Sequence, residues 1–148
     1  MSATVRSVLA VLVGTVSTSV VTYVIEMLVV PLVMPLFPGE FDDRVAFSHN
    51  FWARLFIVAY TLAALAFGGY VAASIARRAP VFHAVIVGAL QIVITVYFVM
   101  LAPHHLYEPP TWKWIALLFL MVPAAAVGGL LRSRHNTSRP IGHAAQPS

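Results

Sequence analysis

Residues 79–107, with the sequence APVFHAVIVGALQIVITVYFVMLAPHHLY, run for 29 positions without Asp, Glu, Lys or Arg. The hydrocarbon core of a bilayer is about 30 Å thick, and a helix needs roughly 20 apolar residues to cross it. Backbone groups in that core must bond within their own segment, because no water is there to bond them. This stretch therefore predicts a transmembrane helix.

Three further stretches follow the same pattern. Residues 55–76 and 114–131 carry no charge over 22 and 18 positions, and residues 7–39 carry one charge, Glu26. With 60% hydrophobic and 9% charged residues, the chain of 148 residues has more apolar surface than a soluble domain of this size buries. We predict an all-α integral membrane protein, a four-transmembrane-helix bundle. The helices are expected at about 7–30, 52–76, 82–102 and 112–131.

The chain is expected to consist of one domain followed by a tail. The four helices and their short loops make a single transmembrane domain over residues 1–134. Residues 135–148 have no apolar period, so we expect a disordered cytoplasmic tail there. Trp52, Trp112 and Trp114 lie where the second and fourth helices begin, which is typical of rings that anchor a helix at headgroup depth.

The charges between the helices divide by sign. One side holds six bases and no acid, and the other side holds all the loop acids; the bases are Arg6, Arg77, Arg78, Arg132, Arg134 and Arg139, and the acids are Glu40, Asp42, Asp43 and Glu108. Lys and Arg in short loops stay on the cytoplasmic side. The pattern predicts a multi-pass protein of a bacterial inner (plasma) membrane with both termini cytoplasmic. The net charge of +4 then reflects topology, so the lipid bilayer and not nucleic acid is the expected partner.

Small residues recur along two of the predicted helices. Such residues let helix backbones approach closely, which is a main source of helix association in lipid. The faces they form would pack either within the bundle or against a second copy or a larger membrane partner. The candidate helix-packing residues are Ala64, Gly68, Gly69, Ala72, Ala73 and Ala76 in the second helix and Ala124, Ala125, Gly128 and Gly129 in the fourth.

The second and fourth helices also end alike. Residues 66–71 read AFGGYV and are followed by Arg77 and Arg78, whereas residues 126–131 read AVGGLL and are followed by Arg132. This similarity suggests two repeated helical hairpins, related by an axis along the membrane normal.

Glu26 is the one ionisable residue inside a predicted span, about 27 Å along the first helix from Val8 and so in the outer third of the membrane. Two interpretations are open: an ion pair with Arg54 at similar depth, or a carboxylate that binds a proton or cation from outside. Hydroxyl groups share its helix face, and Gly88, Gln91 and Thr95 repeat the spacing in the third helix. They would serve as hydrogen bonds between helices or as a polar path toward Glu26. The intramembrane polar candidates are Glu26, Arg54, Gln91, Thr22, Ser19 and Thr95.

The sequence has no signature of catalysis or of a bound cofactor. Cysteine is absent, which excludes disulfides and thiolate metal sites. No phosphate-binding loop, zinc-binding helix motif or nucleophile with a base is present. His104 and His105 with Glu108, near Asp42 and Asp43, are typical of a solvated turn rather than a metal site. We expect no enzyme, no metal and no cofactor.

The start of the chain at Arg6 and the two Gly-Gly helix endings, residues 68–73 and 128–132, resemble those of small, uncharacterised four-helix bacterial inner-membrane proteins, the hypothetical membrane protein family. The resemblance spans the whole chain and implies a fold and a membrane but no activity. We expect a structural, accessory or assembly subunit that packs through its Gly/Ala helix faces. The alternative is a small dimeric transporter or channel that uses Glu26.

Overall fold

The computed structural model describes residues 2–37, 44–76, 78–101 and 112–137. Within these residues the chain is helical and contains no strand. Four helical segments are long and apolar enough to cross a membrane: Ala3–Leu36, Phe51–Ile75, Pro80–Phe98 and Trp112–His135. For the described residues, the prediction of an all-helical chain with four helices long and apolar enough to span a membrane is confirmed, as expected for a multi-pass membrane protein.

The first span changes helix type along its length. It begins as α1 (Ala3–Val24), widens into a π-helical turn, η1 (Ile25–Val29), and continues as α2 (Val30–Val33) and a 3₁₀ turn, η2 (Met34–Leu36). The sequence predicts an end near residue 30, because Pro31 and Pro35 cannot donate backbone hydrogen bonds. In the structure each proline is one of the first two residues after a change of helix type, so the regular hydrogen-bond pattern is interrupted there while the backbone stays helical. The helical backbone therefore extends to Leu36.

The remaining elements are α3 (Arg44–His49), α4 (Phe51–Ile75), α5 (Pro80–Leu101) and α6 (Trp112–Thr137). Asn50 caps α4, because its side-chain oxygen accepts hydrogen bonds from the backbone N–H groups of Trp52 and Ala53. α6 runs six residues past its predicted end at 131 and into the segment expected to be a tail. No Gly or Pro stops the helix there, and Arg134 and His135 complement the negative end of its dipole.

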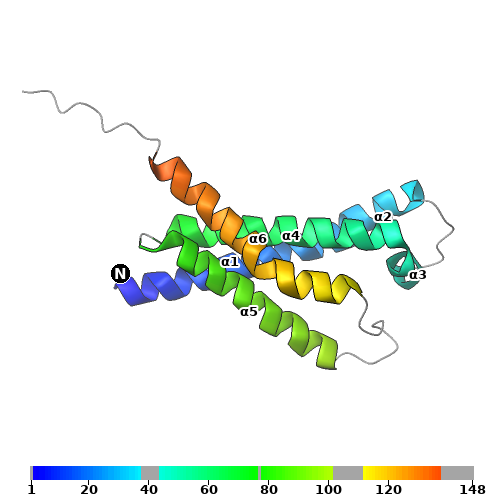
Figure 1. Cartoon of the computed structure of the whole chain (residues 1–148), viewed down its shortest axis with the longest axis horizontal. Helices are drawn as coiled ribbons and strands as arrows, with labels where there is room; N and C mark the ends of the chain where they lie inside the picture. Colours follow the sequence, from blue (N-terminus) through cyan, green and yellow to red (C-terminus); the bar gives the residue numbers. More distant parts are fainter. Residues whose placement is uncertain (1, 38–43, 77, 102–111, 138–148) are drawn as a thin grey trace, which may run out of the picture.

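The bundle is organised around α4 (Figure 1). This helix contacts α1, α5 and α6, and its interfaces with α6 and α1 are the most extensive; α5 packs mainly on α6. Val58 and Leu65 of α4 form one buried cluster with Leu117 and Met121 of α6. The short helix α3 covers the end of α4 at which α4 begins, where Phe47 is buried. The four spans therefore form a bundle whose centre is the α4–α6 interface.

Candidate functional site

The two adjacent glycines of α4 face two different helices. A Cβ atom added at Gly68 would overlap the hydroxyl of Thr18 in α1 and lie 2.6 Å from the carbonyl oxygen of Gly14. A Cβ atom added at Gly69 would overlap the carbonyl oxygen of Ala125 in α6. Neither position has room for a side chain. The Gly-Gly pair thus lets α4 approach α1 and α6 at the same depth.

The Gly-Gly pair of α6 does the same for its own neighbours. A Cβ atom at Gly128 would overlap the carbonyl oxygen of Ala66 in α4, and one at Gly129 would lie 2.7 Å from the Cβ atom of Ala84 in α5. The small residues around the glycines of both helices are also inside the bundle. Buried are Ala64, Ala72, Ala73, Ala76 and Ala125, and Ala124 packs partly buried beside the α4–α6 cluster. These Gly/Ala faces are therefore occupied by contacts within one chain.

Glu26 pairs with a tyrosine. The hydroxyl of Tyr60 in α4 donates a hydrogen bond to Glu26 Oε1 over 3.0 Å. Tyr60 is buried, but Glu26 lies in η1 with its side chain exposed on the outside of the bundle. The ion pair proposed between Glu26 and Arg54 is not seen among the described residues, and Arg54 Nε donates to the carbonyl of Ser48 over 3.0 Å. Arg54 therefore bonds to the carbonyl group of α3, and Tyr60 instead of Arg54 is the partner of the Glu26 carboxylate.

A contact at the opposite end sets the depth of the Glu26–Tyr60 pair. Arg6 Nε donates to the carbonyl oxygen of Ile75 over 2.8 Å, which places the start of α1 level with the end of α4. At about 1.5 Å per residue, Tyr60 lies about 22 Å and Glu26 about 30 Å from that level. The distance of Glu26 from that level is thus about equal to the thickness of a hydrocarbon core, about 30 Å.

Among the described residues, no hydrogen bond joins Glu26 to another of the polar candidates. Ser19 is exposed on the outside of the bundle, whereas Thr22 and Thr95 are partly buried. Gln91 is partly buried, and its Oε1 atom has no hydrogen-bond partner among the described residues. Thr18 is buried, and its hydroxyl donates to the carbonyl of Gly14 one turn earlier. The hydroxyl groups of α1 are thus divided between the interior and the exterior, and no described contact links Gln91 to Glu26.

Sequence reasoning missed Tyr60. One tyrosine in an apolar helix is usually an ordinary core residue, and its link to Glu26 spans 34 positions of sequence. Tyr60 could have been found from its depth along the helix. If α1 and α4 form an antiparallel hairpin in which Arg6 contacts Ile75, Tyr60 lies beside the outer part of the first span.

The remaining candidate from the sequence is the histidine turn, which was considered as a metal site. The histidine turn, His104 and His105 with Glu108, lies outside the described residues, as do Asp42 and Asp43. Among the residues that the structure describes, no three His, Asp or Glu side chains are grouped to hold a metal ion.

No protein-family model matches the sequence, and no curated protein or solved structure is detectably similar to it.

Proposed function

We propose that the protein is a non-enzymatic accessory or assembly subunit of a bacterial inner membrane, and that it binds a partner membrane protein through the outer part of its first span. The observation that carries the proposal is the exposed Glu26 carboxylate, which has Tyr60 on one side and the exterior of the bundle on the other. An acidic group exposed in or near hydrocarbon is costly, and such groups normally find a partner. A basic side chain of a partner helix would supply that partner.

The surface around Glu26 suits a cationic side chain. Tyr23 is one turn away on the same side of the helix and is 63% exposed. An aromatic face beside a carboxylate attracts an ammonium or guanidinium group through both charge and ring quadrupole. The Gly/Ala faces are occupied within the chain, so the proposed docking surface consists of Tyr23 and Glu26 instead.

Site-specific photo-crosslinking tests the docking surface. A benzophenone amino acid is placed at position 23 or, as a matched control, at Val93 of α5, whose side chain is also 63% exposed. We expect a protein adduct from position 23 in native membranes, and about a fivefold loss of that adduct in the Glu26→Gln variant, as for the loss of a charge pair of about 1 kcal/mol. Equal adducts from both positions, or an adduct that Glu26→Gln leaves unchanged, would contradict the proposal.

The second candidate function is a small dimeric transporter or channel. The same observation favours it, because a carboxylate on the outside of one bundle could take up a proton or cation where two copies meet. Proton and cation flux into liposomes separates the two functions. Transport predicts flux that Glu26→Gln abolishes, whereas the accessory role predicts the flux of protein-free liposomes for both chains.

We further propose that both termini are cytoplasmic, on the strength of the six bases at that end. The chain has no cysteine, so single Cys substitutions report topology directly. Ala3 and Ala46 are both exposed alanines at opposite ends of the bundle. In intact cells we expect a membrane-impermeant maleimide to label Ala46→Cys but not Ala3→Cys, and the reverse result would overturn the orientation.

The proposal of two repeated hairpins rests on the similar ends of α4 and α6, and the contacts of their glycines agree with it only in kind. In each hairpin, one glycine of the second helix packs against the first helix of the same hairpin: Gly68 on α1 and Gly129 on α5. The other glycine, Gly69 or Gly128, packs across the α4–α6 interface. Both hairpins thus use one glycine within the hairpin and one across the α4–α6 interface, but the aligned positions Gly68 and Gly128 have different partners.

A further inference from the structure

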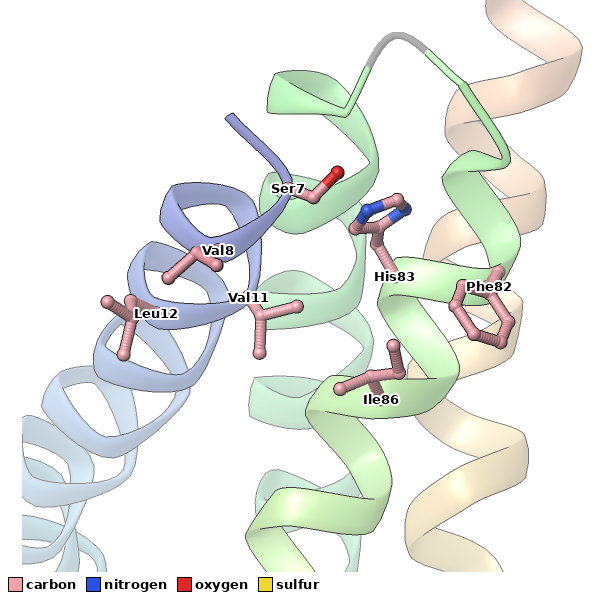
Figure 2. Close-up of a pocket in the computed structure, with 7 residues that line it drawn as sticks. All are labelled: Ser7, Val8, Val11, Leu12, Phe82, His83 and Ile86. Carbon is pink, nitrogen blue, oxygen red and sulfur yellow. The ribbon is translucent and has the colours of Figure 1, made fainter. Parts of the chain in front are cut away.

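A cleft opens between α1 and α5 at the Arg6 end of the bundle (Figure 2). Its volume is about 440 Å³, and its walls are Ser7, Val8, Val11 and Leu12 of α1 and Phe82, His83 and Ile86 of α5. Val8, Leu12 and Phe82 are exposed on the outside of the bundle. The cleft is therefore open sideways, toward the position that lipid would occupy around the bundle.

The cleft is polar at its membrane-surface end and apolar below. Ser7 and the ring of His83 face each other across that end (Figure 2). His83 is held there by its Nδ1 atom, 3.0 Å from the carbonyl oxygen of Ala79, whose φ of 47° marks the tight turn before α5. From Ser7 to Leu12 the apolar wall continues for about 7 Å along the helix axis. A polar end next to an apolar wall is the arrangement that suits a phospholipid, whose headgroup lies at the membrane surface above its acyl chains.

The charge around the polar end of the cleft is positive. Arg6 immediately precedes Ser7, and its Nε atom is fixed on Ile75 at the end of α4. Arg78 is exposed in the turn two residues before α5 begins. No acidic residue occurs within residues 1–25 or 55–107 of the sequence, so none comes from either wall or from the turn. An anionic headgroup would meet bases here without a competing carboxylate.

We propose that this cleft binds an anionic phospholipid, with one acyl chain between α1 and α5 and the phosphate at Ser7, His83 and Arg78. The apolar walls provide affinity for any acyl chain, and the bases select the anionic headgroup. Each Lys or Arg near a membrane surface contributes about 1 kcal/mol toward anionic lipid, which corresponds to about a fivefold preference. The occupant is a membrane lipid and not free phosphate, because most of the wall is apolar.

Native mass spectrometry of the full chain in detergent tests the site. Phosphatidylglycerol and phosphatidylcholine with identical acyl chains are titrated separately. We expect one tightly bound lipid, with phosphatidylglycerol bound at least about fivefold more tightly. Arg78→Gln should weaken phosphatidylglycerol binding about fivefold and leave phosphatidylcholine unchanged. Equal affinities for the two lipids in the wild type, or no effect of Arg78→Gln, would overturn the proposed headgroup contact; inorganic phosphate is expected not to compete.

A second pair of variants tests the position of the acyl chain. Ile86→Trp fills the cleft, whereas Ile115→Trp places the same ring at an exposed position of α6, a helix that supplies no residue to the cleft lining. We expect Ile86→Trp to remove the bound lipid and Ile115→Trp to retain it. Equal binding by both variants would refute the site. If Ile86→Trp fails to give a helical, monodisperse protein, Val11→Trp fills the cleft from α1, and Arg78→Gln in the exposed turn tests the site without altering the packing.

Discussion

Replacing Gly128 with Ala is expected to lower the free energy of unfolding by about 2 kcal/mol, although Ala is the better helix former. In an open helix this substitution would stabilise by about 1 kcal/mol. Here the added methyl group overlaps the carbonyl oxygen of Ala66 and lies 2.8 Å from the backbone nitrogen of Tyr70. Both neighbours are backbone atoms, which cannot rotate away as a side chain would. α4 and α6 must therefore separate, and overpacking of this kind costs about 1–3 kcal/mol.

The sign of the change makes the Gly128→Ala experiment decisive. Unfolding is followed by circular dichroism and tryptophan fluorescence during a titration with sodium dodecyl sulphate. Val127→Ala is the control, because Val127 is the neighbouring residue and is 50% exposed, so its truncation should change stability by less than about 0.5 kcal/mol. A Gly128→Ala chain more stable than wild type would mean that α4 and α6 do not pack at this glycine.

The spans were predictable from sequence because hydropathy is a local property. A run such as residues 79–107 requires a helix in lipid whatever its neighbours are. The end of the first span was less predictable. Pro31 breaks the regular hydrogen-bond pattern, but the π turn before it, in which the N–H of Val30 bonds to the carbonyl of Ile25, keeps the backbone helical. Whether a proline ends a helix or changes its type depends on the packing around it.

The contacts of the candidate site depend on the direction in which each side chain leaves its helix. The position of a residue along the helix axis does not give this direction, so the contacts could not be predicted from depth alone. Depth made Arg54 a reasonable partner for Glu26, yet the hydrogen bond comes from Tyr60, about 1.7 turns further along α4. The Gly-Gly pairs likewise predicted close helix contacts without indicating which helix each glycine would meet. Gly68 and Gly69 differ by about 100° around α4, enough to direct one to α1 and the other to α6.

Gly68→Ala is the second substitution with a large expected effect, about 2–3 kcal/mol of lost stability, at the interface between α4 and α1. The added methyl group overlaps the hydroxyl of Thr18, which is buried and bonded to the carbonyl of Gly14. It also lies 2.6 Å from that carbonyl oxygen. Thr18 could rotate only by giving up its hydrogen bond, and the carbonyl belongs to the α1 backbone. The change therefore combines overpacking with the loss of a buried hydrogen bond.

The double variant Gly68→Ala with Thr18→Ala separates these two obstacles. Thr18→Ala alone should cost about 1 kcal/mol or less, as is usual for hydroxyl groups inside membrane bundles. In combination it removes the hydroxyl but not the Gly14 carbonyl, so we expect it to restore about half of the stability lost in Gly68→Ala. The two single changes would then fail to add by about 1 kcal/mol or more, which is the measure of direct contact in a double-mutant cycle. Additive losses would show that the two positions do not meet, and the antiparallel pairing of α1 with α4 that brings Glu26 to Tyr60 would lose its main support.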